Sequence, residues 1–156
     1  MQARIEEKFS WVDGTQKIRD MILDDLVDGD LAFGLGGNTM TLGELCKEMG
    51  EVELSYINGF KTFKQDFSER VNDASLTTSI TAIKTWWASL DVDLQSTLDT
   101  LNETDLDKTI DRGFPIDIVT QVDIYLQAIL IFLGKATVYL RAMNKPLSEK
   151  MIAWIG

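Results

Sequence analysis

The sequence predicts an all-α protein, an antiparallel four-helix bundle with a short C-terminal helix. Three observations indicate this class. Apolar residues recur at three- and four-residue steps in four long segments, strand signals such as sustained alternation or Asn-Gly hairpin turns are absent, and the 156 residues include only 2 prolines. A length of about 100 to 200 residues is typical of one domain, so we expect a single domain over residues 1–156.

The first helix is the least regular of the four in its sequence pattern. Helical spacing of apolar residues begins at Ile5, is interrupted at Gly14 and continues to about Val27. A glycine-rich loop, 28–40, follows. Its glycines are interpreted as turn residues, because no strand precedes them and no Lys-Ser/Thr pair follows them, as a phosphate-binding loop would require.

The second helix has the clearest start. Thr41 and Glu44 form a capping box in the sequence TLGE, and Met40 before the cap is placed to pack on Leu45. From there one apolar face continues for six turns. The residues of that face are Leu42, Leu45, Met49, Val52, Tyr56, Phe60 and Phe63.

The third and fourth helices are separated by an acidic linker. One apolar face over about 79–101 predicts the third helix, and the linker contains one expected helical turn at 104–108. Asp117 is placed to cap the fourth helix, which extends over about 118–143 and ends at Asn144.

The fourth helix is apolar nearly all round in its middle. Leu126, Leu130 and Leu133 lie on one side, and Ile124 and Ile131 lie on the other. A helix in a four-helix bundle buries about one stripe, so the surplus predicts a fifth covering segment or a partner subunit. The last segment, SEKMIAWIG, is expected to supply part of that cover with three side chains on one side, Met151, Trp154 and Ile155.

The charge balance excludes several partners. Lys and Arg total 15 against 25 Asp and Glu, a net charge of −10, so the chain repels nucleic-acid phosphates and anionic membrane surfaces. The longest uncharged stretch in the most apolar region, 124–134, has 11 residues, short of the roughly 20 that a membrane-spanning helix needs. The N-terminus lacks the apolar core of a signal peptide, so we expect a cytoplasmic protein.

The residue types present exclude much enzyme chemistry. The chain has no histidine and one cysteine, Cys46, which removes Ser/His/Asp and Cys/His triads, HExxH sites and Cys/His zinc clusters. Cys46 lies near an apolar stripe without a histidine to activate it, so we interpret it as a core thiol.

Two segments carry a resemblance to a known family. TLGELCKEMGEVE resembles the second helix of the DinB-like (DinB/YfiT) metal-binding four-helix-bundle superfamily, and LIFLGKATVYLRAMNKP resembles the end of its fourth helix. The resemblance implies up-down-down-up connectivity and a homodimer. It also implies a divalent metal held by three histidines, one from the second helix and two from the fourth, in hydrolases or thiol transferases.

The three implied histidine positions fall at about Glu48, Ala128 and Phe132 in this chain, and none is histidine. A methyl group and a phenyl ring offer a metal no lone pair, and one carboxylate makes a weak site. We therefore expect a variant of the superfamily with a degenerate metal site and no metal or other cofactor.

Two acids are candidates for catalysis. Glu48 is a residual ligand or a general base at the mouth of a pocket, or else an ordinary solvated residue. Glu53 projects close to the apolar stripe, where a buried carboxylate needs a partner or a raised pKa; it is an acid or base, or else a structural hydrogen-bonding group.

Three functional hypotheses follow. The first is a binding or interaction protein that acts without metal, on a ligand that the sequence does not identify. The second is a hydrolase or thiol transferase that uses Glu48 and Glu53, with or without a divalent metal. The third is a ligand carrier with an apolar pocket lined by Phe132, Tyr125 and Trp87, next to Glu48 and Ala128.

Overall fold

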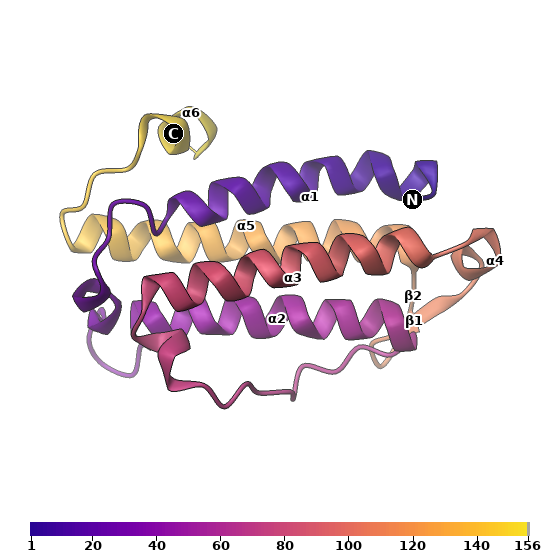
Figure 1. Ribbon diagram of the computed structural model, residues 1–156, viewed down its shortest axis with the longest axis horizontal. Helices are drawn as coiled ribbons and strands as arrows, with labels where there is room; N and C mark the ends of the chain where they lie inside the picture. The colour runs from indigo at the N-terminus through magenta and orange to yellow at the C-terminus, as the bar shows by residue number, and fades with distance from the viewer. Residues whose placement is uncertain (156) are drawn as a thin grey trace.

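In the computed structural model, which describes residues 1–155, four long helices form a bundle with up-down-down-up connectivity (Figure 1). Helix α1 packs beside α5, and α2 packs beside α3. The long helices are α1 (Ala3–Met21), α2 (Leu42–Thr62), α3 (Ile80–Thr100) and α5 (Ile118–Ala142). The short elements are η1 (Asp28–Ala32), η2 (Ala74–Thr77), α4 (Glu103–Leu106), β1 (Thr109–Asp111), β2 (Pro115–Asp117) and α6 (Glu149–Ile155).

The connection between α2 and α3, residues 63–79, returns along the length of the bundle (Figure 1). The connection must span this length because α2 and α3 run in the same direction, so the end of α2 lies far from the start of α3. The connection is held to α2 at several points. Asn58 donates a hydrogen bond to Glu69 at 2.6 Å, and Glu51 accepts one from the backbone of Val71 at 3.0 Å.

The predicted caps are confirmed. The Thr41 hydroxyl accepts a hydrogen bond from the Glu44 backbone at 3.2 Å, and the Glu44 carboxylate accepts one from the Thr41 backbone at 2.7 Å. Asp117 caps α5 by accepting a hydrogen bond from the Thr120 backbone at 2.9 Å. These caps satisfy amide groups that the first turn of a helix leaves unpaired, which is why the sequence located both helix starts closely.

The structure differs from the sequence-based prediction at the start of the chain and in the acidic linker. Gly14 does not interrupt α1, which is continuous to Met21, because a helix tolerates one glycine at a cost of about 1 kcal/mol. The linker contains a hairpin of β1 and β2, in which Ile110 pairs with Ile116, although no strand was expected. Strands of three residues are too short to display alternation in a sequence.

The C-terminal helix α6 packs on α1, with Met151 buried there. Trp154 is 66% exposed, so it does not cover the bundle together with Met151 as expected. The side chain of Ile155, the third residue expected there, lies outside the described residues. Because α6 lies on α1, part of α5 keeps an exposed apolar face. Leu130, Ile131 and Val138 of that face are all more than half exposed.

By length and composition alone, α5 could also cross a membrane. A core helix passes the same test, and the most buried side of α5, which includes Tyr125 and Ile129, faces the interior of the bundle.

Two helical glycines make a matched stability test. A methyl group at Gly43 would overlap the carbonyl oxygen of Thr77 in η2, whereas a methyl group at Gly14 meets nothing within 4 Å. We expect Gly43→Ala to lower the free energy of unfolding by about 1 to 3 kcal/mol, and Gly14→Ala to raise it by roughly 0.5 to 1 kcal/mol. Urea denaturation measures both, and equal effects would contradict the close packing of η2 on α2.

Candidate functional site

An apolar slot lies between the first half of α2 and the middle of α5. Its volume is about 160 Å³. Its lining residues are Leu45, Glu48, Met49, Val52, Ala128, Ile131, Phe132 and Lys135. The helical repeat explains the set, because residues three, four and seven apart on each helix share the face that meets the neighbouring helix.

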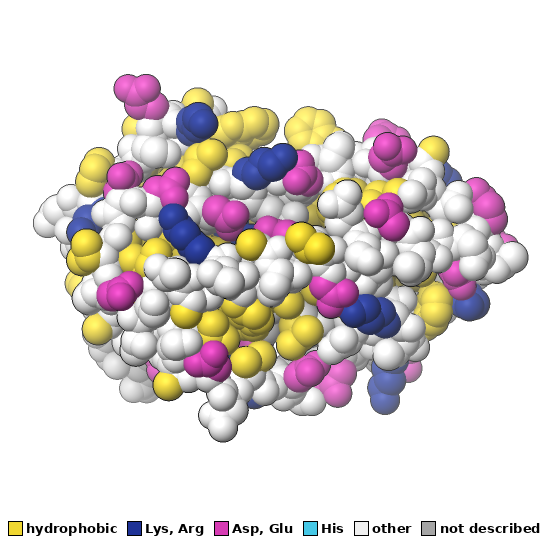
Figure 2. All heavy atoms as spheres, in the orientation of Figure 1, with side chains coloured by type: hydrophobic (Ala, Val, Ile, Leu, Met, Phe, Trp, Pro, Cys, Tyr) yellow, Lys and Arg dark blue, Asp and Glu magenta, His cyan; other side chains and the backbone are white. Residues whose placement is uncertain are grey.

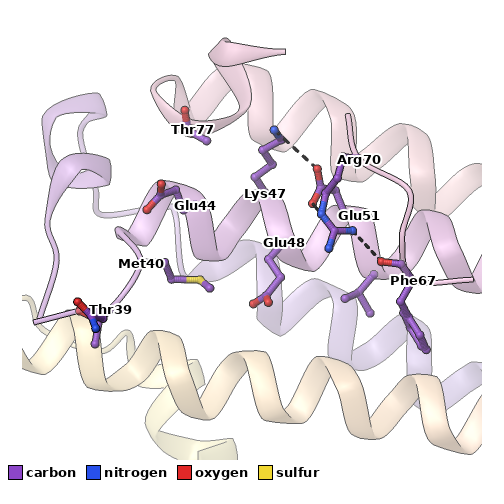
Figure 3. Close-up of a pocket in the computed structure, with 11 residues that line it drawn as sticks. Thr39, Met40, Glu44, Lys47, Glu48, Glu51, Phe67, Arg70 and Thr77 are labelled. Atoms are coloured by element: carbon purple, nitrogen blue, oxygen red, sulfur yellow. Dashed lines mark hydrogen bonds and ion pairs between the residues drawn. The ribbon is translucent and has the colours of Figure 1, made fainter. Parts of the chain in front are cut away.

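A wider trough of about 890 Å³, lined mainly by polar and charged side chains, lies beside the slot on α2 (Figure 3). Glu48 and Val52 line both cavities. The other residues of the trough are Asn38, Thr39, Met40, Glu44, Lys47, Glu51, Phe67, Arg70 and Thr77, so the glycine-rich loop, α2 and the α2–α3 connection all contribute. The site therefore joins an apolar end to a polar, mixed-charge end.

In this site Glu51 lies near two cations, whereas Glu48 lies near one. Lys47 and Arg70 both lie 3.7 Å from the carboxylate of Glu51. Glu48 points away from these three side chains, toward α5 (Figure 3), where Lys135 lies 3.6 Å away. The Glu48 and Lys135 side chains are 43% and 52% exposed. Their ion pair is therefore long and open to water, and such pairs contribute about 0 to 1 kcal/mol.

The structure brings Glu48, Ala128 and Phe132 together in this slot, but it places the other two expected lining residues elsewhere. Tyr125 and Trp87 are in the core, at 1% and 0% exposure, and neither lines the slot. The Phe132 ring packs against Trp87 with 5.6 Å between ring centroids, so Phe132 separates the slot from the core. Tyr125 shares the helical spacing of Ala128 and Phe132 on α5, but packing turns it into the core. Trp87 lies on α3, whereas the lining residues lie on α2 and α5.

Glu53 belongs to a different cluster, a buried polar network in the middle of the bundle. The Arg19 guanidinium donates to Glu53 at 2.8 Å, and the Gln16 amide donates to the other oxygen of the same carboxylate at 2.9 Å. Arg19 also donates to Asp91 of α3 at 2.9 Å and to Asp20 at 2.8 Å. Both Arg19 and Glu53 are fully buried.

The sequence pattern did not point to Arg19 or Gln16 as partners of Glu53. A signal was present, because Arg19 follows Ile5 and Val12 at seven-residue steps and so shares their buried face of α1. Its guanidinium also stacks on Trp87, with 4.6 Å from the central carbon to the ring centroid.

The network shifts the protonation of its members. Burial raises the pKa of Glu53 to about 8; the charge of Arg19 opposes this effect, and the nearby carboxylate of Asp91 adds to it. Burial tends to lower the pKa of Arg19, but Glu53 and the other acids outweigh it and hold that pKa above its ordinary value. The cluster thus contains one permanent cation and a carboxyl group poised to keep its proton.

Cys46 is buried in the core, as expected. Burial raises the pKa of its thiol to about 12, which keeps it protonated and unreactive at neutral pH.

The donor set at the slot does not fit a metal ion. Ala128 and Phe132 have no donor atoms, and Glu48 faces a lysine. Among residues 1–155, no group of three or more Cys, Asp or Glu side chains could hold a metal ion.

These features define an all-α bundle with a cavity between its second and last long helices, and comparison with solved structures identifies the fold as DinB-like. A DinB-like protein from Bacillus cereus superposes with a TM-score of 0.77 at 17% identity, covering 92% of this chain and 95% of that one. YjoA, a DinB-like protein from Bacillus subtilis, gives 0.71 at 14% identity, covering 90% and 94%. No family model and no curated protein sequence matches the chain.

Proposed function

We propose that this chain is a non-catalytic binding protein, which takes a small molecule into the slot between α2 and α5 and works without a metal ion. One observation carries the proposal. One apolar slot is lined by all three residues that stand where the DinB-like resemblance implies histidines, namely Glu48, Ala128 and Phe132. A slot lined mainly by hydrocarbon with a few polar groups at its edge is typical of ligand sites.

The arrangement of the two acids supports this proposal over an enzyme that uses both. Glu48 lies at the slot, whereas Glu53 is fully buried and held by Arg19 and Gln16. An acid and a base that act on one substrate must both reach it within hydrogen-bonding distance.

Metal content tests the proposal. Protein purified without chelator is expected to contain less than about one tenth of an equivalent of zinc or nickel by elemental analysis, because the slot offers a single carboxylate next to a lysine. A near-stoichiometric metal content that falls in Glu48→Gln would contradict it and favour the hydrolase or thiol-transferase alternative.

We also propose that the protein is a cytoplasmic homodimer, formed through the exposed face of α5. Leu130 and Ile131 precede Gly134, and Val138 follows it, so the face is apolar on both sides of a residue without a side chain. Such a face is self-complementary about a two-fold axis near Gly134, as an isologous dimer requires.

Sedimentation equilibrium tests the dimer. At micromolar concentration we expect twice the mass of one chain, and Leu130→Lys is expected to shift the protein to the monomer by placing like charges at the axis. Val92→Lys is the control, because Val92 is also exposed but lies on α3. A monomer in the unmodified protein would overturn this assembly.

A further inference from the structure

We propose that the ligand of the slot is an amphipathic amine, with an apolar group of about five carbons in the slot and its ammonium against Glu48. This inference rests on the proposed function, because it names the chemical class that the same slot selects.

The volume and the lining of the slot determine the apolar part of the ligand. Six of the eight lining side chains are hydrocarbon or thioether, and the Phe132 ring, backed by Trp87, closes the slot on the core side. A volume of 160 Å³ divided by the roughly 30 Å³ of a water-sized group leaves room for about five such groups. Burial of an alkyl chain of this length removes apolar surface from water and so favours binding.

The position of Glu48 determines the polar part of the ligand. It is the one carboxylate that lines both the slot and the trough within the described residues. An ammonium group at the slot mouth would replace the ammonium of Lys135, which now lies 3.6 Å away and is half exposed. The ligand has the advantage because its alkyl group is buried, whereas the Lys135 side chain can turn into water without loss.

The surrounding charges favour a cation over an anion. Glu44 and Glu51 lie on the same wall as Glu48, and the two cations of the trough, Lys47 and Arg70, are both engaged by Glu51. The net charge of the whole chain is −10. A carboxylate ligand would have Lys135 alone as its partner and would meet this negative field, which raises the local concentration of cations instead.

The test compares three probes of equal length, n-pentylamine, n-pentanol and pentanoate, by titration followed with two-dimensional amide NMR at low salt. For the unmodified protein we expect shifts at slot residues and an affinity for the amine about five- to tenfold above that for the alcohol. Pentanoate is expected to bind more weakly than the alcohol.

Two matched variants separate the roles of the charges. Glu48→Gln is expected to reduce the affinity for the amine to that for the alcohol. Lys135→Met is expected to raise the affinity for the amine about two- to fivefold, because it removes the competitor. Ala128→Phe fills the slot and is expected to abolish the binding of all three probes, with circular dichroism as the check on folding.

The outcomes distinguish this inference from the proposed function. Preferential binding of pentanoate that Lys135→Met removes would overturn the amine assignment, as would equal binding of all three probes; both would leave a ligand-binding slot. If none of the probes perturbs slot residues, or if Ala128→Phe leaves binding unchanged, both the inference and the proposed function fail.

Discussion

Replacement of Arg19 by methionine is expected to lower the free energy of unfolding by about 3 to 5 kcal/mol, because it removes the buried cation that pairs with Asp91 and Asp20 and donates a hydrogen bond to Glu53. Arg19 is fully buried and, among the described residues, is the only cation within ion-pairing distance of Glu53, Asp91 and Asp20. Without it, the side-chain donors left to Glu53 are the Gln16 amide and the Tyr125 hydroxyl. Urea denaturation at pH 7 measures the loss.

Two further variants test whether the loss of stability is specific to the buried network around Arg19. Lys17→Met removes an ion pair to Asp13 in the same helix, at 2.6 Å but largely exposed, and is expected to change stability by less than about 0.5 kcal/mol. The double variant with Arg19→Met and Glu53→Met is expected to recover part of the loss, because two apolar side chains replace a buried polar pair. A double variant less stable than Arg19→Met alone would show that Glu53 is stabilised by groups other than Arg19.

The second large effect is the pH dependence that Glu53 confers. The titratable groups that face it are Arg19 from α1, Asp91 from α3 and Tyr125 from α5. Because burial raises the pKa of Glu53 from 4.5 to about 8, the folded protein holds a proton that the unfolded chain releases above pH 4.5. The stability contributed by this group is therefore fully present below pH 4.5 and is lost as the pH rises to about 8.

The variant Glu53→Gln tests whether this group makes stability fall as the pH rises. Glutamine imitates the protonated acid at all pH values, so the two proteins should be similar in stability near pH 4.5, and the variant should become the more stable one by pH 8. The difference should change by at most about 1.4 kcal/mol per pH unit. An unmodified protein that gains stability over the variant as the pH rises would show that Glu53 is ionised in the fold.

A hydrogen-bonding argument supports the retained proton. Within the described residues, one oxygen of Asp91 is buried without a hydrogen-bond partner, and Glu53 lies within hydrogen-bonding reach of Asp91. The proton retained by Glu53 would satisfy that oxygen, whereas an ionised Glu53 would leave it unpaired and place two acceptor groups against each other.

The sequence predicted those parts of the fold that depend on local chemistry. Caps at Thr41 and Asp117 depend on residues three apart, and the apolar stripes depend on the helical repeat, so both were readable from the chain. The DinB-like resemblance supplied the connectivity. The convergence of Glu48, Ala128 and Phe132 in one slot then follows from the way α2 and α5 pack.

The sequence did not predict features that depend on contacts between distant residues. The partnership of Glu53 with Arg19 joins residues 34 positions apart, and the local patterns indicate only that each side chain lies near an apolar face, not that the two side chains meet. The docking of α6 on α1 likewise depends on which exposed apolar surface is within reach of a short tether. Tyr125 has the spacing of the lining residues of α5, and only the packing around it decides that it fills the core.

The long return of residues 63–79 along the bundle has a consequence for the covalent chain. Cleavage in its exposed part, near Ser68 and Glu69, divides the protein into one piece with α1 and α2 and another with α3 to α6. Both main helix pairs, α1 with α5 and α2 with α3, join one piece to the other. The two polypeptides should therefore remain associated after nicking and should reassemble when they are produced separately, as a split protein whose halves complement each other.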